Sequence, residues 1–259
     1  MSKKNNIFGS ATEAIVYPIL LLVVMWLVFW ADHLFNLIDF YKFGVMPKTV
    51  IGLKGILFMP LIHSYSEIEH IVNNSFPTLI LLAAIVYYYR SIALRIFILS
   101  WILTGFGLWL FATNNNSYHI GMSGIIYAMA GFLFTSGIIR KFRPLQGISM
   151  IVAFVYGSMI WGIFPMETHV SWEGHLSGLV VGVALALYYR KQGPQSPKYM
   201  YEIEQEMGIE PPDLEGQWLE NVRQAEEKMR LMEEHRKHQE EVKVIYHYQE
   251  KPKDDNEQK

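Results

Sequence analysis

The sequence contains no cysteine, which excludes disulfide bonds and thiolate metal sites. Charged residues are scarce in its first part, because residues 1–189 contain only 10 Lys/Arg and 7 Asp/Glu. Residues 190–259 contain 12 Lys/Arg and 17 Asp/Glu in a much shorter stretch. About a quarter of the residues in an average soluble domain are charged, so the two parts deviate in opposite directions. This distribution argues against a single soluble globule, a secreted disulfide scaffold and a basic nucleic-acid-binding protein.

Most of residues 1–189 belongs to long stretches that lack Asp, Glu, Lys and Arg. A membrane-spanning helix needs about 20 apolar residues, because all its backbone polar groups must be satisfied within the segment. One uncharged stretch, Ile96–Ile139, is long enough for two helices and is divided by the polar run Thr113–Ser117. The sequence therefore predicts an all-α membrane protein with a bundle of six transmembrane helices. The other uncharged stretches are Ala14–Ala31, His70–Tyr89, Pro144–Met166 and Gly174–Tyr189.

The positions of Lys and Arg predict the orientation of these spans. Nine of them lie at span ends that alternation places on one side, whereas three lie in the long loop after the first span. Cytoplasmic loops carry an excess of Lys and Arg, so we expect both termini in the cytoplasm of a multi-pass protein of the bacterial inner membrane. The first span is interpreted as retained, because no small-residue cleavage site follows it. The nine residues are Lys3, Lys4, Arg90, Arg95, Arg140, Lys141, Arg143, Arg190 and Lys191.

The first loop, Asp32–Glu69, needs separate treatment from the spans. It contains the uncharged stretch Gly55–Ser66, which is too short to cross a bilayer. We therefore expect a surface-lying or re-entrant element there. The chain as a whole is predicted to consist of a six-span domain, residues 1–190, and a charged cytoplasmic tail, residues 191–259.

The tail is predicted to contain one amphipathic helix. Pro211-Pro212-Asp213 is typical of a helix start, and the apolar residues that follow recur at steps of three and four. Further on, Val242–Tyr248 alternates as in a short strand. The tail is interpreted as a simple appendage, with a functional docking helix as the alternative. The apolar residues of the helix are Leu214, Trp218, Val222, Ala225, Met229 and Met232.

Small residues recur every three or four positions on the fourth and sixth spans, and such stripes let two helices approach closely. Ser123 adjoins the first stripe and His175 lies at the edge of the second. Packing of the two stripes would bring both side chains together near the outer mouth of the bundle, with ordinary transmembrane packing as the alternative. The stripes are Gly124, Ala128 and Gly131, and Gly174, Gly178, Gly182 and Ala186.

Polar side chains inside a membrane are costly and usually face a cavity, so three motifs at the external ends of the second, fourth and sixth spans are candidates for chemistry. The motifs are His70-x-x-x-Asn74, Gly121-x-Ser123-Gly124 and His175-x-x-Gly178-x-x-x-Gly182. Their combination, in this order on three helices, resembles the rhomboid family of intramembrane serine proteases. The resemblance covers about residues 14–190.

The resemblance implies a catalytic dyad of Ser123 and His175, without a third acid. It implies that the Ser123 backbone N–H and the side chains of His70 and Asn74 stabilise the oxyanion, and that Tyr127 supports the site by packing against His175. The implied partners are the lipid bilayer and a single-span protein substrate that is cleaved near the outer leaflet. No nucleic acid, metal or cofactor is implied.

Two other functions compete with this reading. A proteolytically inactive rhomboid-like protein that binds membrane clients is disfavoured, because such relatives usually lack the serine or histidine. A small-solute transporter would show duplicated halves with interrupted helices, and no such repeat is present.

Many bacterial rhomboids carry a Trp-Arg pair in the first loop, and none occurs between Asp32 and Glu69. His119 is interpreted as an interfacial residue, with a role in admitting water as the alternative.

Overall fold

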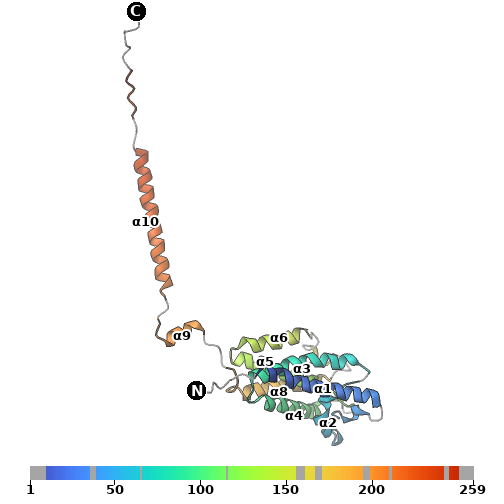
Figure 1. Ribbon diagram of the computed structural model, residues 1–259. Coiled ribbons are helices and arrows are strands. Elements are labelled where there is room, and N and C mark those ends of the chain that lie inside the picture. The colour runs from blue at the N-terminus through green and yellow to red at the C-terminus, as the bar shows by residue number, and fades with distance from the viewer. Residues whose placement is uncertain are drawn as a thin grey trace, which may run out of the picture. The chain divides into compact units, whose positions relative to one another are not determined.

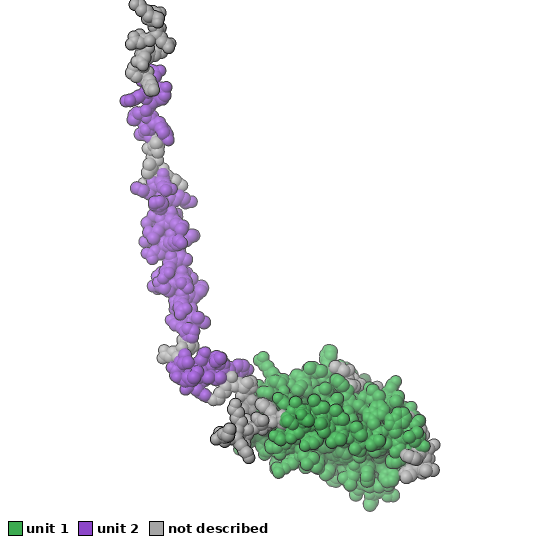
Figure 2. Space-filling view, in the orientation of Figure 1, with its two compact units in different colours: residues 1–197 green, residues 198–259 purple. Residues whose placement is uncertain are grey.

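The structure is a computed structural model of the 259-residue chain. The chain forms two compact units, residues 1–197 and residues 198–259 (Figure 2). The residues that the structure describes are 10–35, 39–64, 66–114, 116–155, 161–166, 171–194, 199–209, 212–241 and 245–250.

Apolar helices form the first unit, in which α1, α3, α4, α5, α6 and α8 pack side by side (Figure 1). Three of them, α1, α3 and α4, are long and apolar enough to cross a membrane, and α5 and α8 are apolar helices of 17 residues each. The predicted all-helical architecture is confirmed for the described residues, which contain no strand. The bounds are α1 Ala11–Phe35, α2 Gly55–Phe58, α3 Ile68–Tyr88, α4 Ala93–Phe111, α5 Ser123–Ile139, α6 Arg143–Val155 and α8 Trp172–Tyr188.

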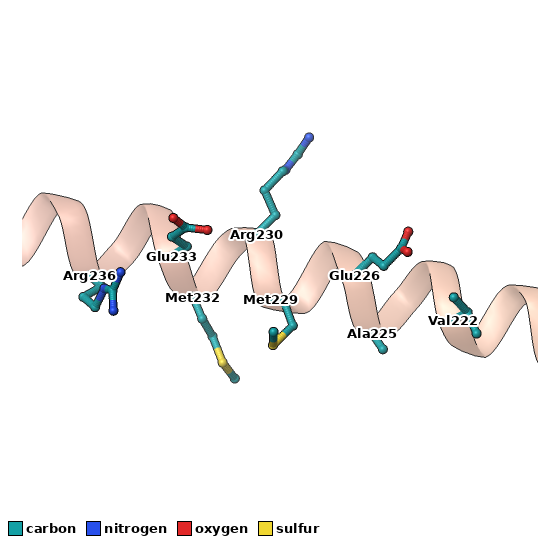
Figure 3. A pocket seen from close by; sticks show the side chains of 8 residues that line it. All are labelled: Val222, Ala225, Glu226, Met229, Arg230, Met232, Glu233 and Arg236. Carbon is teal, nitrogen blue, oxygen red and sulfur yellow. The ribbon is translucent and has the colours of Figure 1, made fainter.

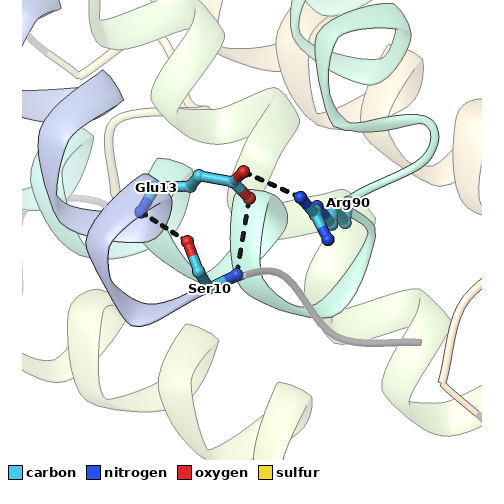
Figure 4. A network of polar contacts seen from close by, with 3 residues as sticks. All are labelled: Ser10, Glu13 and Arg90. Carbon is cyan, nitrogen blue, oxygen red and sulfur yellow. Dashed lines mark hydrogen bonds and ion pairs between the residues drawn. The ribbon is translucent and has the colours of Figure 1, made fainter. Parts of the chain in front are cut away.

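The start of α1 is held to the loop after α3 by a polar network (Figure 4). Ser10 caps the helix, because the Glu13 backbone N–H donates to Ser10 Oγ over 3.0 Å. The Glu13 carboxylate in turn accepts a hydrogen bond from Arg90 over 2.8 Å. Both charges are partly exposed, so the pair contributes little stability. It does require that the start of α1 and the end of α3 lie at the same end of the bundle.

Arg140, directly after α5, contacts residues that follow the ends of two other helices, α8 and α3. Its buried guanidinium donates to the carbonyl oxygen of Tyr189 over 2.7 Å and to that of Gln192, both just after α8. It also lies 5.7 Å from the centre of the Tyr89 ring, directly after α3. The ends of α3, α5 and α8 therefore meet, and the starts of these helices share the opposite end.

The stripes of small residues hold α5 against α8, the most extensive helix contact among the described residues. A Cβ atom added at Gly178 would lie 1.9 Å from the carbonyl oxygen of Gly124. One added at Gly182 would lie 2.1 Å from the carbonyl oxygen of Ala128. Only glycine allows this approach of the two backbones, so the predicted packing of the stripes is confirmed.

The first loop contains short helical turns where a non-spanning element was predicted. It lies against α4, because the Trp101 indole N–H donates to the Ile56 carbonyl over 2.9 Å. The backbones of Val45 and His119 also exchange two hydrogen bonds of 2.9 and 2.8 Å. The loop is thereby connected to the segment that precedes α5. Its turns besides α2 are η1 Phe40–Phe43, η2 Ile51–Lys54 and η3 Met59–Leu61.

The second unit contains α9, Met200–Glu206, and α10, Leu214–Glu241. Asp213 caps α10, because its carboxylate accepts the Gly216 backbone N–H over 2.8 Å. The predicted tail helix and its start are thus confirmed. The predicted strand is wrong in the part that can be compared, because residues 245–250 have no regular structure; residues 242–244 lie outside the described residues.

Candidate active site

The packing of α5 on α8 brings Ser123 and His175 into contact. Ser123 is the first residue of α5, and His175 lies in the first turn of α8. The Oγ atom of Ser123 is 2.8 Å from Nε2 of His175, which is hydrogen-bonding distance. His175 is buried and Ser123 is half-buried, so the serine is the more accessible residue of the two.

The hydrogen bond of the other ring nitrogen of His175 indicates which tautomer of the imidazole is present. Its Nδ1 lies 2.9 Å from the carbonyl oxygen of Gly162. A carbonyl oxygen only accepts, so Nδ1 carries the proton, and the Nε2 of a neutral ring then presents its lone pair to Ser123. The group that orients the histidine is therefore a main-chain carbonyl. No pattern of residue types points to Gly162, because a backbone acceptor requires no particular side chain.

Tyr127 provides a second constraint on the histidine ring. Its ring stacks on that of His175, with centroids 4.3 Å apart and planes 15° from parallel. Tyr127 follows Ser123 by one helical turn, so both side chains are on the same face of α5. The stacked ring and the Gly162 carbonyl together fix the orientation of the imidazole toward the serine.

His70 and Asn74 lie beside the turn that precedes Ser123. A Cβ atom added at Gly121 would be 2.8 Å from Nε2 of His70 and 3.8 Å from Nδ2 of Asn74. Gly121 also has a φ of +110°, a conformation that other residues rarely adopt. Both the space and the backbone conformation therefore require glycine here, and the turn passes directly over the two side chains.

Two kinds of hydrogen-bond donor are available at this turn. The Asn74 amide uses one N–H to donate to the carbonyl oxygen of His70 over 3.0 Å, and an amide group has a second N–H. Ser123 begins α5, and the first N–H groups of a helix have no acceptor within it. The arrangement thus combines a serine hydroxyl, a basic imidazole nitrogen and N–H donors that can stabilise a developing negative charge.

His63, to which the sequence assigned no role, connects parts of this site. Its side chain is 1% exposed, and its Nε2 accepts the Met122 backbone N–H over 3.4 Å. Its ring also packs edge-on against that of His70, with centroids 5.0 Å apart. Burial, with His70 nearby, lowers the pKa of His63 to about 3, so the ring stays neutral and keeps its acceptor nitrogen. The sequence feature that could have pointed to His63 is its position in an apolar loop, seven residues before His70.

The segment before α5 is bonded to the start of α8. The Nδ1 of His119 lies 2.7 Å from Oγ of Ser171, the residue before α8. Both the N–H and the hydroxyl group of Thr113 donate to the Glu173 carboxylate, over 3.1 and 2.8 Å. The Ser171 carbonyl accepts the backbone N–H of His175 over 3.2 Å. His119 therefore belongs to a network that positions the first turn of α8, beyond the interfacial role expected for it.

Among the residues that the structure describes, no three His, Asp or Glu side chains lie close enough together to hold a metal ion. The groups around Ser123 are a hydroxyl group, an imidazole nitrogen, the carbonyl that orients the imidazole and N–H donors, a set that suits acyl transfer.

The family model of the Rhomboid domain matches residues 52–192, which is more than half of the chain. The chain belongs to the rhomboid family. The match extends from the first loop to just beyond α8, so it includes Ser123, His175 and the other candidate residues described above. Rhomboids are usually intramembrane serine proteases, and the apolar helices make this chain a rhomboid-family membrane protein.

Similar proteins occur in mycobacteria. An uncharacterized protein of Mycobacterium tuberculosis and one of Mycobacterium bovis are each 36% identical over 156 residues, covering 55% of this chain and 62% of theirs. An uncharacterized protein of Mycobacterium leprae is 32% identical over 150 residues, covering 55% of this chain and 59% of its own. This rhomboid thus spans less than two thirds of the length of these relatives.

Proposed function

We propose that this rhomboid is an intramembrane serine endopeptidase that cleaves single-span membrane proteins near the outer leaflet with a Ser123–His175 dyad. The observation that carries the proposal is the 2.8 Å contact between Ser123 Oγ and His175 Nε2. The Gly162 carbonyl and the Tyr127 ring support it, because they hold the imidazole in the orientation and proton form of a general base. Family membership supports the same class of reaction.

In the proposed reaction, Ser123 Oγ attacks the scissile carbonyl carbon while His175 Nε2 takes its proton. The resulting imidazolium then donates that proton to the leaving amine, and the peptide bond breaks to leave an acyl-enzyme. Water, deprotonated by the same Nε2, then attacks the ester carbonyl, and the imidazolium returns this proton to Ser123 Oγ as the ester C–O bond breaks and the carboxyl product leaves. The Gly162 carbonyl accepts from Nδ1–H throughout, so no carboxylate is needed to orient the ring.

The oxyanion of each tetrahedral intermediate would be held by the Ser123 N–H and the side chains of His70 and Asn74. The close approach of the Gly121 turn supports this assignment. A Cβ atom added at Gly121 would lie 2.8 Å from His70 Nε2 and 3.8 Å from Asn74 Nδ2. Preorganised donors of this kind contribute about 10²–10³ in rate each. His63 would act through its neighbours, holding the Met122 N–H and the His70 ring in place.

The proposal includes six spans with both termini in the cytoplasm of a bacterial inner membrane. Arg90 and Arg140 lie at the end of the bundle where α3, α5 and α8 terminate. The positive-inside rule makes that end cytoplasmic. Ser123 and His175 begin their helices, so they lie at the other end, toward the outer leaflet. The mycobacterial relatives support a bacterial setting.

The test is cleavage of a generic single-span substrate by the purified full chain in detergent. Wild type is expected to cleave, and Ser123→Ala and His175→Ala to lose at least about 10³-fold in kcat. Ser177→Ala is the matched control, because this serine is on α8 but donates to the Thr104 carbonyl, away from the dyad. Turnover by folded Ser123→Ala would overturn the dyad. Binding without cleavage by wild type would favour an inactive client-binding rhomboid.

A further inference from the structure

The helix α10 presents an apolar stripe that is open in the described part of the chain. Trp218, Met229 and Met232 are 62%, 70% and 56% exposed. Figure 3 shows Met229 and Met232 projecting from the same side of the helix as Ala225, whereas Glu226 and Glu233 project from another. Large apolar side chains exposed in a row mark a surface that binds a partner.

The spacing of the stripe is that of a coiled-coil seam. Trp218, Val222, Ala225, Met229 and Met232 follow one another at alternating steps of four and three. This is the a and d pattern of a heptad, and it makes a narrower stripe than the face of a helix that packs on a globular core. Val222 and Met229 take the a positions, and the other three take the d positions.

The charge of α10 selects between a membrane surface and a second copy of the chain. The helix Leu214–Glu241 contains eight glutamates and only five Lys/Arg. Helices that lie on membranes are rich in Lys and Arg on the polar face, because the cytoplasmic leaflet is anionic. A net negative helix with a narrow seam fits a second copy better than it fits an anionic bilayer.

The residues that flank the seam determine the direction of the pair. The e positions include Glu226 and Glu233, and the g positions include Asn221 and Lys228. In a parallel dimer each g residue faces the following e residue of the partner helix, which places Lys228 opposite Glu233 of the second copy. An antiparallel dimer would instead place the e-position glutamates opposite one another.

Within one chain, Glu233 pairs with Lys237 at 3.5 Å. Both side chains are more than half exposed, so this contact contributes little and competes weakly with an interchain pair. We propose that α10 joins two copies of this chain as a parallel two-stranded coiled coil along the Trp218–Met232 seam.

The seam is short, and isolated short helices are marginal in water. Two chains inserted in one membrane, however, meet at a raised effective concentration, which favours pairing of their tails. The proposal does not depend on proteolysis, because α10 contains no residue of the candidate active site.

Disulfide crosslinking tests the proposal directly, because the chain has no cysteine of its own. Single variants Val222→Cys and Met229→Cys of the full chain would be oxidised in proteoliposomes at low protein density. A parallel, in-register pair brings each thiol to its counterpart, so both variants are expected to form dimers. Glu227→Cys, at the outward f position, is the matched control and is expected to crosslink roughly tenfold less.

A charge exchange tests the predicted direction. In the Met229→Cys background, Lys228→Glu is expected to weaken association roughly fourfold, because two symmetry-related pairs each contribute about twofold. Adding Glu233→Lys should restore crosslinking.

Crosslinking at only one of the two a positions would indicate an antiparallel pair, and equal crosslinking at all three sites would indicate random collision. Uncrosslinked a-position thiols shielded from a water-soluble maleimide would indicate membrane binding. Each of these three results would overturn the proposal.

Discussion

His175 has partners of three chemical kinds, and each limits a different freedom of its ring. The Ser123 hydroxyl faces Nε2, the Gly162 carbonyl faces Nδ1, and the Tyr127 ring covers one face. Two hydrogen bonds and one stack leave the ring few alternative orientations. A histidine held in this way can act as a base without the carboxylate that orients it in a Ser-His-Asp triad.

Asn74→Ala is expected to lower kcat about 10²-fold, because the loss of one preorganised oxyanion donor costs about 10²–10³ in rate. KM should change little, since the donor acts on charge that develops after binding. The measurement is steady-state cleavage of a transmembrane substrate in detergent. Ser75→Ala is the control, because this neighbouring side chain bonds Trp26 instead of the turn. An equal loss in both variants would contradict the assignment.

His63 gives a pH prediction for stability. Burial lowers its pKa to about 3 in the folded state, whereas an unfolded histidine titrates near 6.5. Below about pH 6.5 the unfolded chain therefore binds a proton that the folded chain rejects, so stability falls with pH until about pH 3. The slope approaches about 1.4 kcal/mol per pH unit. His63→Gln, compared by thermal unfolding from pH 7 to 4, should show a flatter decline; an unchanged decline would contradict the buried neutral ring.

The contact between the Ser123 and His175 side chains was predictable from sequence, but the main-chain partner of His175 was not. Ser123 and His175 adjoin glycine stripes whose spacing already implied that two helices touch. Gly162 lies 13 residues before His175 in a connecting segment and acts through its carbonyl alone. A carbonyl group is common to all residues, so no pattern of residue types can reveal which one accepts a given hydrogen bond.

Among the helices, the contact of α5 with α8 has the greatest consequence, since it determines the distance between serine and histidine. A methyl group at Gly182 would lie 2.1 Å from the Ala128 carbonyl oxygen, which forces the two backbones apart. Gly182→Ala is therefore expected to destabilise the bundle by about 1–3 kcal/mol. The matched control is Gly147→Ala on α6, where an added Cβ meets nothing within 4 Å. Equal melting temperatures for the two variants in detergent would show that α5 and α8 are not in close contact.

The first loop and the tail show where prediction from patterns is less complete. The length of Gly55–Ser66 predicted a non-spanning element, but its attachment to α4 through Trp101 depends on tertiary contacts that have no local signal. In the tail, the apolar period predicted α10 correctly. The alternation in Val242–Tyr248 was a misleading signal for residues 245–250, because a single strand without a partner has no acceptors for its backbone groups.

For the whole molecule, the division into two units predicts which truncations are tolerated. Arg140 donates to the Gln192 carbonyl, and Pro194 is buried, so the residues just after α8 belong to the packed bundle. A chain that ends at residue 197 is expected to keep near-normal proteolysis in detergent, because the second unit contains no site residue. A chain that ends at Arg190 should melt at a lower temperature. If the chain that ends at residue 197 lost activity while its bundle stayed folded, the tail would have to act on the site from a distance.

His175 is proposed to make Ser123 a nucleophile, and chemical labelling measures this activation most directly. A fluorophosphonate reacts covalently with serine hydroxyl groups that are activated by a base, and peptide mass spectrometry locates the adduct. Wild-type protein is predicted to carry one adduct on Ser123, and His175→Ala, purified as a folded bundle, to carry none at the same exposure. An unlabelled Ser123 in the folded wild type, or equal labelling in the variant lacking the histidine, would contradict the account.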